Sequence, residues 1–243
     1  MTNIVIPMAG AGSRFSKAGF QKPKPFIDVA GKPMIVRVLE NLAYPNARYI
    51  LLARQEHMDA EAGLVRDIER DFNAIFIPIP ELTEGTACTL LYARQHINTE
   101  APLLIANSDQ IVDLRIADFL DDCQHRQLDG SILTFIDEHR DPKWSFAKID
   151  ATGLVTEVQE KKAISEFATV GIYLYSRGSD FVNAAIDMIV RRERVNNEYY
   201  TCPTYNYAIR AGKKIGIYNI AASAMHGIGT PEDLASYLAL TQP

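Results

Sequence analysis

Several features that would mark particular protein classes are scarce or missing in this chain of 243 residues. The three cysteines, Cys88, Cys123 and Cys202, are scattered without a CxxC pair, which argues against a structural zinc site and a disulfide framework. No apolar run approaches the ~20 residues that span a bilayer. The first residues lead directly into an apolar segment, without the basic region or cleavage site of a signal peptide. The sequence therefore predicts no membrane association and a cytoplasmic location.

An excess of basic residues is also missing. The chain has 25 Lys and Arg against 30 Asp and Glu, a net charge of -5, whereas a nucleic-acid-binding surface needs clustered positive charge. We therefore expect no nucleic-acid partner. Hydrophobic residues make up 47% and charged residues 23%, which is typical of a folded protein. Without a linker, repeat or low-complexity tract, residues 1–243 are expected to form one domain, with two lobes as the alternative.

The first half of the chain alternates short apolar segments with amphipathic ones. This alternation predicts βαβ units, and hence an α/β fold with a Rossmann-like, mostly parallel mixed sheet and helices on both faces. Strands are expected at 3–8, 48–53, 74–79 and 102–106, and helices at 34–43, 56–71, 86–97 and 115–126. The second half predicts strands at 130–136, 145–150, 154–159, 167–175 and 214–220, and helices at 177–191, 203–211 and 231–240.

A glycine-rich loop, Met8-Ala9-Gly10-Ala11-Gly12-Ser13-Arg14, follows the first strand directly. Glycines allow a tight turn, successive N–H groups can bind phosphate oxygens, and the Arg14 guanidinium can add a bidentate contact. The loop lacks the third glycine of GxGxxG and the Gly-Lys-Ser/Thr ending of a P-loop. Taken alone it is compatible with either a phosphate site or a plain tight turn.

Two Lys-Pro pairs, eight residues apart, lie in the run Lys24-Pro25-Phe26-Ile27-Asp28-Val29-Ala30-Gly31-Lys32-Pro33, and Lys22-Pro23 directly precedes it. With these pairs the chain resembles the sugar-phosphate nucleotidyltransferases, also called nucleoside-diphosphate-sugar pyrophosphorylases. Their opening pattern is a Gly-x-Gly-x-Arg loop, a Lys-Pro pair and a second Gly-Lys-Pro before a helix. The resemblance implies the nucleotide-diphospho-sugar transferase (GT-A-like) fold, with 1–126 as a nucleotide-binding half and 127–243 as an acceptor-binding half.

The resemblance also implies roles for residues around the nucleotide. Arg14 matches the arginine that contacts the triphosphate, and Lys24, rather than Lys22, matches the catalytic lysine. Glu81 or Glu84 is expected near the base; because an ionised carboxylate only accepts hydrogen bonds, it would favour CTP or GTP. The remaining nucleotide-binding residues are expected to be Ala9, Gly10, Gly12, Ser13, Gly85, Thr86 and Ser108.

A metal site is expected after the fourth strand, at Asn107-Ser108-Asp109, because ligands of open α/β sheets bind beyond the carboxyl ends of strands. A turn-capping role for Asp109 is the alternative from spacing alone; by resemblance this aspartate binds Mg²⁺. The family usually has a second metal-binding aspartate where this chain has Gly227. Either Asp109, phosphates and water hold the ion, or another side chain substitutes. The neighbouring His226 is equally compatible with a substrate contact and an ordinary surface residue.

The acceptor side is expected in the second half. The resemblance implies that Glu160 binds sugar hydroxyls and that Lys161 is a catalytic residue that binds the sugar phosphate. It also implies that Gly171 lets the sugar approach the backbone. The segments around Trp144 and Glu198 differ from ordinary sugar pyrophosphorylases. Their bulky aromatic side chains predict a narrowed acceptor pocket. The alternative is that these aromatic side chains are buried in the core and have no role in the pocket. A solvated lysine pair is likewise the alternative at Lys161-Lys162.

The implied reaction joins a nucleoside triphosphate to a phosphorylated acceptor, a sugar 1-phosphate or another small phosphate, and releases pyrophosphate. The setting implied by resemblance is precursor synthesis for surface polysaccharide. A glycosyltransferase of related fold and a non-catalytic nucleotide-binding homologue are the alternatives. The first usually carries an Asp-x-Asp pair, whereas Asp109 and Asp113 are too widely spaced. The oligomeric state is not determined by the sequence, and a homo-oligomer is compatible with it.

Overall fold

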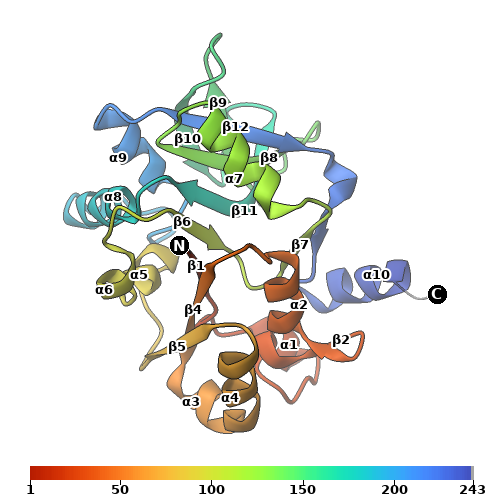
Figure 1. The fold of residues 1–243 in the computed structure, drawn as a ribbon. Coiled ribbons are helices and arrows are strands. Elements are labelled where there is room, and N and C mark those ends of the chain that lie inside the picture. Colours follow the sequence, from red (N-terminus) through yellow and green to blue (C-terminus); the bar gives the residue numbers. More distant parts are fainter. Residues whose placement is uncertain (242–243) are drawn as a thin grey trace.

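A nine-stranded sheet runs through the molecule, in which the computed structural model describes residues 1–241 (Figure 1). Seven strands follow the order β10-β9-β11-β6-β1-β4-β5, and β8 pairs with both β11 and β12. Their bounds are β1 (Thr2–Pro7), β4 (Ala47–Arg54), β5 (Ala74–Ile79), β6 (Leu103–Ala106), β8 (Gly130–Ile136), β9 (Ser145–Ile149), β10 (Val155–Glu160), β11 (Phe167–Tyr175) and β12 (Ile215–Ile220).

The sheet is mixed, and the change of direction occurs at β11. The strands β5, β4, β1 and β6 are parallel neighbours, as the alternation of strand and helix signals predicts. The strand β11 lies antiparallel to β6, β8 and β9, and β12 is again parallel to β8. The predicted α/β class with a mixed sheet is confirmed, and the parallel portion is concentrated in the first half of the chain.

Helices cover both faces of this sheet. Because side chains alternate along a strand, Ile4 and Ile6 of β1 pack against one set of helices and Val5 against the other. Helices α2 (Met34–Asn41), α4 (Ala62–Asp71) and α7 (Ile116–His125) lie on the first face. Helices α5 (Thr86–Leu91), α6 (Arg94–Ile97), α8 (Gly178–Val190) and α9 (Thr204–Arg210) lie on the second.

Short elements near the candidate site complete the fold. Helix α10 (Pro231–Thr241) packs beside α1 (Ser13–Lys17) in a separate small cluster that includes Phe15, Ile228 and Leu234. The other short elements are the helix α3 (Gln55–Ala60), the 3-10 turns η1 (Lys24–Phe26) and η2 (Ala222–Ala224), the hairpin of β2 (Asp28–Val29) with β3 (Lys32–Pro33), and the pair β7 (Gln110–Val112) with β13 (Met225–Gly227).

The structure differs from the sequence expectations at several places, and the short elements α1, β2 and β3 are among those not expected. The helix expected over 56–71 is two helices that meet at Glu61, and the helix expected over 86–97 is interrupted at 92–93. The strands β7 and β13 were not expected. Each has only three residues and pairs with a partner more than a hundred positions away, so neither carries a local periodic signal.

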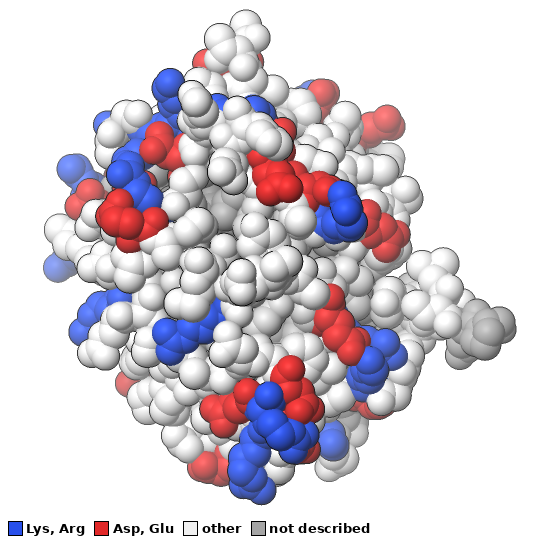
Figure 2. Space-filling model, viewed as in Figure 1, with Lys and Arg blue, Asp and Glu red and all other residues white. Residues whose placement is uncertain are grey.

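Among residues 1–241, no helix combines the length and apolarity that crossing a bilayer requires. On the face shown in Figure 2, Lys and Arg side chains lie interspersed with Asp and Glu rather than in one broad basic area.

A stacked tyrosine pair connects the sheet to α9. The rings of Tyr175 and Tyr205 are parallel within 6°, with centroids 4.5 Å apart. The Tyr205 hydroxyl lies 2.9 Å from the Leu174 carbonyl oxygen and 3.1 Å from that of Ser131, and donates to them.

We predict that Tyr205→Phe lowers the free energy of unfolding by about 1–3 kcal/mol, because a buried acceptor loses its donor. Urea unfolding with an unchanged m-value is the measurement. Tyr92→Phe, at a side chain that is 44% exposed, serves as the control and should stay within about 0.5 kcal/mol of the wild type. Equal midpoints for Tyr205→Phe and the wild type would contradict the prediction.

Candidate active site

The glycine-rich loop between β1 and α1 forms one wall of a cavity of about 380 Å³. Gly12 is the N-cap residue of α1 and has a φ of +60°, a conformation that glycine adopts without strain. A Cβ at this position would lie 3.2 Å from the Cβ of Lys24, so the loop and the Lys-Pro segment pack closely. Gly10, Gly12 and Ser13 all line the cavity, as expected for the phosphate end of a nucleotide site.

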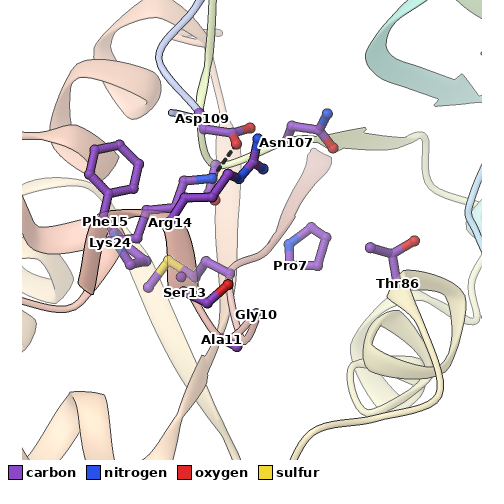
Figure 3. Close-up of a pocket in the computed structure, with 15 residues that line it drawn as sticks. Pro7, Gly10, Ala11, Ser13, Arg14, Phe15, Lys24, Thr86, Asn107 and Asp109 are labelled. Carbon is purple, nitrogen blue, oxygen red and sulfur yellow. Dashed lines mark hydrogen bonds and ion pairs between the residues drawn. The ribbon is translucent and has the colours of Figure 1, made fainter. Parts of the chain in front are cut away.

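Three charged side chains meet in this cavity, as Figure 3 shows. The Lys24 ammonium pairs with Asp109 Oδ2, and the two side chains are only 17% and 22% exposed. Arg14 reaches the same place from the first turn of α1. Lys22, the lysine of the Lys-Pro pair directly before Lys24, has a side chain that is instead 55% exposed and pairs with Glu61 at 3.6 Å. Lys24 therefore lies in the cavity and Lys22 outside it, while the catalytic role of Lys24 stays a prediction.

Asp109 is held by the segment that follows β13. The Ile228 N–H donates to the Asp109 carbonyl at 2.9 Å, and a Cβ on Gly229 would come within 2.6 Å of Asp109 Oδ2. Glycine at 229 therefore keeps this carboxylate oxygen accessible. A hard divalent ion prefers such oxygen ligands and takes others from phosphates and water. Asp109 consequently fits a metal that arrives with a nucleotide.

At Gly227, where the family usually has its second aspartate, an added Cβ would lie 4.0 Å from Asp233 Oδ2. Gly227 pairs with Gln110 in the β7–β13 ladder, and residues 1–241 contain no group of three or more His, Cys, Asp and Glu side chains placed to hold a metal. His226 lies 2.9 Å from Asp113 and lines neither cavity of the candidate site.

A second cavity of about 360 Å³ opens beside the first and contains the residues expected on the acceptor side. Glu160 ends β10, Lys161 follows it, and Gly171 lies in β11. Trp144 also lines this cavity, and its ring packs edge-on against Phe135 at 5.3 Å. Trp144 therefore packs against the core and also forms part of the cavity wall.

The two cavities form one continuous cleft because Arg14, Thr86 and Asn107 line both of them. Asn107 follows β6 and lies against Gly171, where a Cβ would come within 2.1 Å of Asn107 Nδ2. Gly171 has a φ of +92°, so glycine is required by conformation as well as by space. The pair sets the boundary between the proposed nucleotide and acceptor sides.

Burial raises the pKa of Glu160 above its ordinary value, although the Ser145 hydroxyl donates to its carboxylate and lowers the pKa in part. Cys202, which is fully buried nearby, has a thiol whose pKa is also raised by burial. A poorly solvated carboxylate has a strong tendency to accept hydrogen bonds from a ligand. Glu160 is thus suited to bind hydroxyl groups.

The loop before α5 is fixed by a segment more than a hundred residues away. The Tyr199 N–H donates to the Glu84 carbonyl at 2.8 Å, and the Ala87 N–H donates to the Tyr199 carbonyl at 2.9 Å. Thr86 Oγ1 in turn accepts from the Thr201 N–H at 3.1 Å. Gly85 makes this approach feasible, since a Cβ there would come within 2.5 Å of the Tyr199 backbone.

Some expected residues lie outside the cleft. Ala9 is buried in the core, Glu81 is exposed, and neither lines a cavity of the site. The Glu84 carboxylate pairs with Arg194 at 2.9 Å. Glu198 is exposed beside the acceptor cavity without lining it. Ser108 is buried and does line the first cavity. The roles assigned to these residues stay predictions.

Sequence reasoning missed several residues of the cleft. The signal for Asn107 was present, because it directly precedes Ser108 at the end of a strand. Tyr200, Thr201 and Cys202 lie in the segment around Glu198 that the sequence singled out, but no individual role was assigned to them. The cavity-lining residues without an assigned role include Asn107, Gln110, Thr169, Tyr173, Tyr200, Thr201 and Cys202.

A family model described as "Nucleotidyl transferase" matches residues 4–235. The chain belongs to this family. One relative is the mannose-1-phosphate guanylyltransferase catalytic subunit beta of Drosophila pseudoobscura pseudoobscura, which is 27% identical over 72% of this chain and 48% of that protein. Another is the probable mannose-1-phosphate guanylyltransferase 3 of Oryza sativa subsp. japonica, which is 29% identical over 70% of this chain and 48% of that protein. The chain thus spans about half the length of these relatives.

Solved structures share the fold of this nucleotidyl transferase. A nucleoside-diphosphate-sugar pyrophosphorylase from Vibrio cholerae RC9 superposes with a TM-score of 0.83 at 25% identity, over 97% of this chain and 99% of that one. A putative glucose-1-phosphate thymidylyltransferase from Bacillus anthracis has a TM-score of 0.77 at 18% identity, over 99% and 95%. The second likeness concerns the fold alone. Together they confirm the nucleotide-diphospho-sugar transferase-like fold.

We predict that Gly85→Ala destabilises the protein by at least about 1–3 kcal/mol, because φ is +125° at this position and the added Cβ meets the Tyr199 backbone. Urea unfolding is the measurement. Gly63→Ala is the matched control, since nothing lies within 4 Å of its added Cβ in α4, and it should be neutral or stabilising. Similar unfolding midpoints for the two variants would refute the proposed close packing.

A second prediction concerns pH. Because the pKa of Glu160 is raised in the folded protein above its ordinary value of 4.5, the folded state holds this proton more tightly than the unfolded chain. Its contribution to stability is present below the unfolded pKa and is lost as pH rises through the folded pKa. Wild type should therefore lose stability relative to Glu160→Gln as the pH rises through and above 4.5. Urea unfolding across this range measures it, and a constant difference would contradict the prediction.

Proposed function

We propose that the protein transfers a nucleoside monophosphate from a nucleoside triphosphate to a sugar 1-phosphate and releases pyrophosphate. The convergence of Arg14, Lys24 and Asp109 beside the glycine-rich loop carries this proposal. The cleft continues from there to Glu160 and Lys161, so it offers separate places for two phosphorylated substrates. The names of the relatives and of the Vibrio cholerae structure support the same class of reaction.

In the proposed reaction an oxygen of the acceptor phosphate attacks the α-phosphorus of the triphosphate. A new phosphorus–oxygen bond forms, the bond to the β-phosphate breaks, and pyrophosphate leaves with the bond electrons. The acceptor oxygen is already anionic at neutral pH, so the step needs no general base. The main barrier is the approach of two anions, which cations and N–H donors in a cleft reduce.

Each charged residue has a distinct part in this proposal. Arg14 and the loop N–H groups bind the phosphates of the triphosphate, and Lys161 binds the acceptor phosphate. Lys24 moves from Asp109 to the phosphates and offsets charge that grows in the transition state. Asp109 would then hold the metal, proposed as Mg²⁺, whose chemistry is to neutralise and align phosphate oxygens. Arg14 lies at the junction of the two cavities, where both substrates meet.

The substrates proposed are GTP and a hexose 1-phosphate such as mannose 1-phosphate, on the strength of the relatives' names. CTP, favoured equally by the carboxylate argument, is the second nucleotide to test. Since Glu84 pairs with Arg194 and Glu81 lies outside the cleft, neither carboxylate is the basis of this choice. The product would be a nucleotide sugar, which a glycosyl transfer must consume, consistent with a role in polysaccharide precursor synthesis.

The deciding experiment measures pyrophosphate release with GTP, CTP, UTP and ATP, each with mannose 1-phosphate, glucose 1-phosphate or no acceptor, and with or without Mg²⁺. Release that requires triphosphate, acceptor and metal together supports the proposal. A glycosyltransferase would consume a nucleotide sugar without releasing pyrophosphate. A non-catalytic homologue would bind triphosphate and release none.

Lys24→Met is expected to lower kcat by about 10²–10³-fold, the typical effect of removing one transition-state donor. Lys22→Met is the matched control, because Lys22 belongs to the adjacent Lys-Pro pair but is paired with Glu61 outside the cavity. The assay is pyrophosphate release on folded variants, checked by thermal unfolding. Near-normal turnover by Lys24→Met, or an equal loss of turnover in both variants, would contradict the proposed catalytic role of Lys24.

A further inference from the structure

The ammonium group of Lys161 is held by one side chain, Tyr200. Lys161 follows the last residue of β10 and has a φ of +56°, which is uncommon for a residue with a side chain. Its Nζ donates to the Tyr200 hydroxyl at 2.7 Å and lies 4.7 Å from the centre of the Tyr200 ring. A long, exposed lysine otherwise samples many rotamers. The hydroxyl and the ring together restrict it to one direction.

Tyr200 is itself fixed in place by its neighbours. Tyr199 is buried in the cluster with Ala87 and Met188, and exchanges backbone hydrogen bonds with the loop before α5. On the other side, the Thr201 N–H and hydroxyl both donate to Thr86 Oγ1, at 3.1 and 3.0 Å. While Tyr199 faces the core, Tyr200 lines the acceptor cavity. The ring that contacts Lys161 is therefore presented by a well-anchored segment.

We propose that Tyr200 is a positioning residue, which holds the Lys161 ammonium in the direction needed to receive the phosphate of the acceptor. The inference rests on the proposed function, because it assigns a partner to the lysine on the acceptor side. An ammonium group has three donors, so donation to Tyr200 leaves two for phosphate oxygens. Because the same segment binds Thr86, which also lines the nucleotide cavity, the position of Lys161 is set relative to the nucleotide.

Other charged groups also face Lys161. Glu160 and Glu198 lie close enough to favour its protonated form, as does the hydrogen bond to Tyr200, and together they raise the pKa of Lys161. The hydrogen bond is the largest of these influences. Loss of the Tyr200 hydroxyl should consequently lower the pKa of Lys161, while the two carboxylates remain.

The first experiment tests the pairing without turnover. Lysine reactivity toward an acetylating reagent is measured across a pH series by peptide mass spectrometry, in wild type and Tyr200→Phe. The reactivity midpoint of Lys161 is expected to shift to lower pH in the variant, whereas that of Lys148, an exposed lysine of β9, stays unchanged. An unchanged Lys161 midpoint would overturn the inference, whatever the enzyme's activity.

The second experiment tests the positioning role with GTP and mannose 1-phosphate as probes. Tyr200→Phe is expected to raise the KM for the acceptor about tenfold, which corresponds to a charged hydrogen bond. The KM for GTP should stay unchanged, since Tyr200 does not line the nucleotide cavity. Tyr92→Phe, at an exposed tyrosine outside the cleft, is the matched control.

A double variant shows whether Tyr200 acts through Lys161. In a Lys161→Met background, Tyr200→Phe should cause no further rise in the acceptor KM. Equal losses in both backgrounds, or parallel changes in both substrates' KM values, would mean a structural role and overturn the positioning role. A wild type that releases no pyrophosphate with any substrate pair counts against the proposed function, while the labelling result still decides the Lys161–Tyr200 pairing.

Discussion

The ion pair between Lys24 and Asp109 depends on the adjacency of two parallel strands, and most of the cleft is arranged around it. Because β1 and β6 are direct neighbours, the glycine-rich loop after the first and Asn107–Asp109 after the second emerge at the same edge of the sheet. The Lys-Pro segment then packs against Gly12 and directs Lys24 toward Asp109. Opposite charges at this edge neutralise each other in the structure, and in the proposed function they would be redistributed to phosphates and a metal.

The second half of the chain completes the cleft through the antiparallel strand β11. This strand lies beside β6, so Gly171 meets Asn107, and the cavity that contains Glu160 joins the cavity that contains Lys24 there. Gly171 and Gly85 both lack a side chain where another segment of the chain packs closely. A Cβ at these positions would meet Asn107 and the Tyr199 backbone, respectively. Two contacts between distant segments thus bring the proposed substrate sites together.

The segment that contains Tyr199, Tyr200 and Thr201 connects these two sides. It was noticed in the sequence for its aromatic content, with core packing as the alternative to an acceptor role. The structure assigns the two tyrosines to different environments, because Tyr199 packs in the core and Tyr200 faces the cavity. Adjacent residues of an extended segment point to opposite sides. The core-packing alternative therefore holds for Tyr199, whereas a role of this segment toward the acceptor stays a prediction.

The sequence by itself determined the order of the main strands and helices and the position of the glycine-rich loop, because local apolar periodicity and motif spacing carry that information. The preference for Lys24 over Lys22 came from the family resemblance and stays a prediction. Only the tertiary structure decided the contacts between distant segments. These are the strand pairs β7–β13 and β11–β6, the contact of Asn107 with Gly171, and the packing of Tyr199 against Gly85. These contacts join residues far apart in the chain. Their energy comes from packing and hydrogen bonds that exist only once the sheet has formed, and no local pattern encodes them.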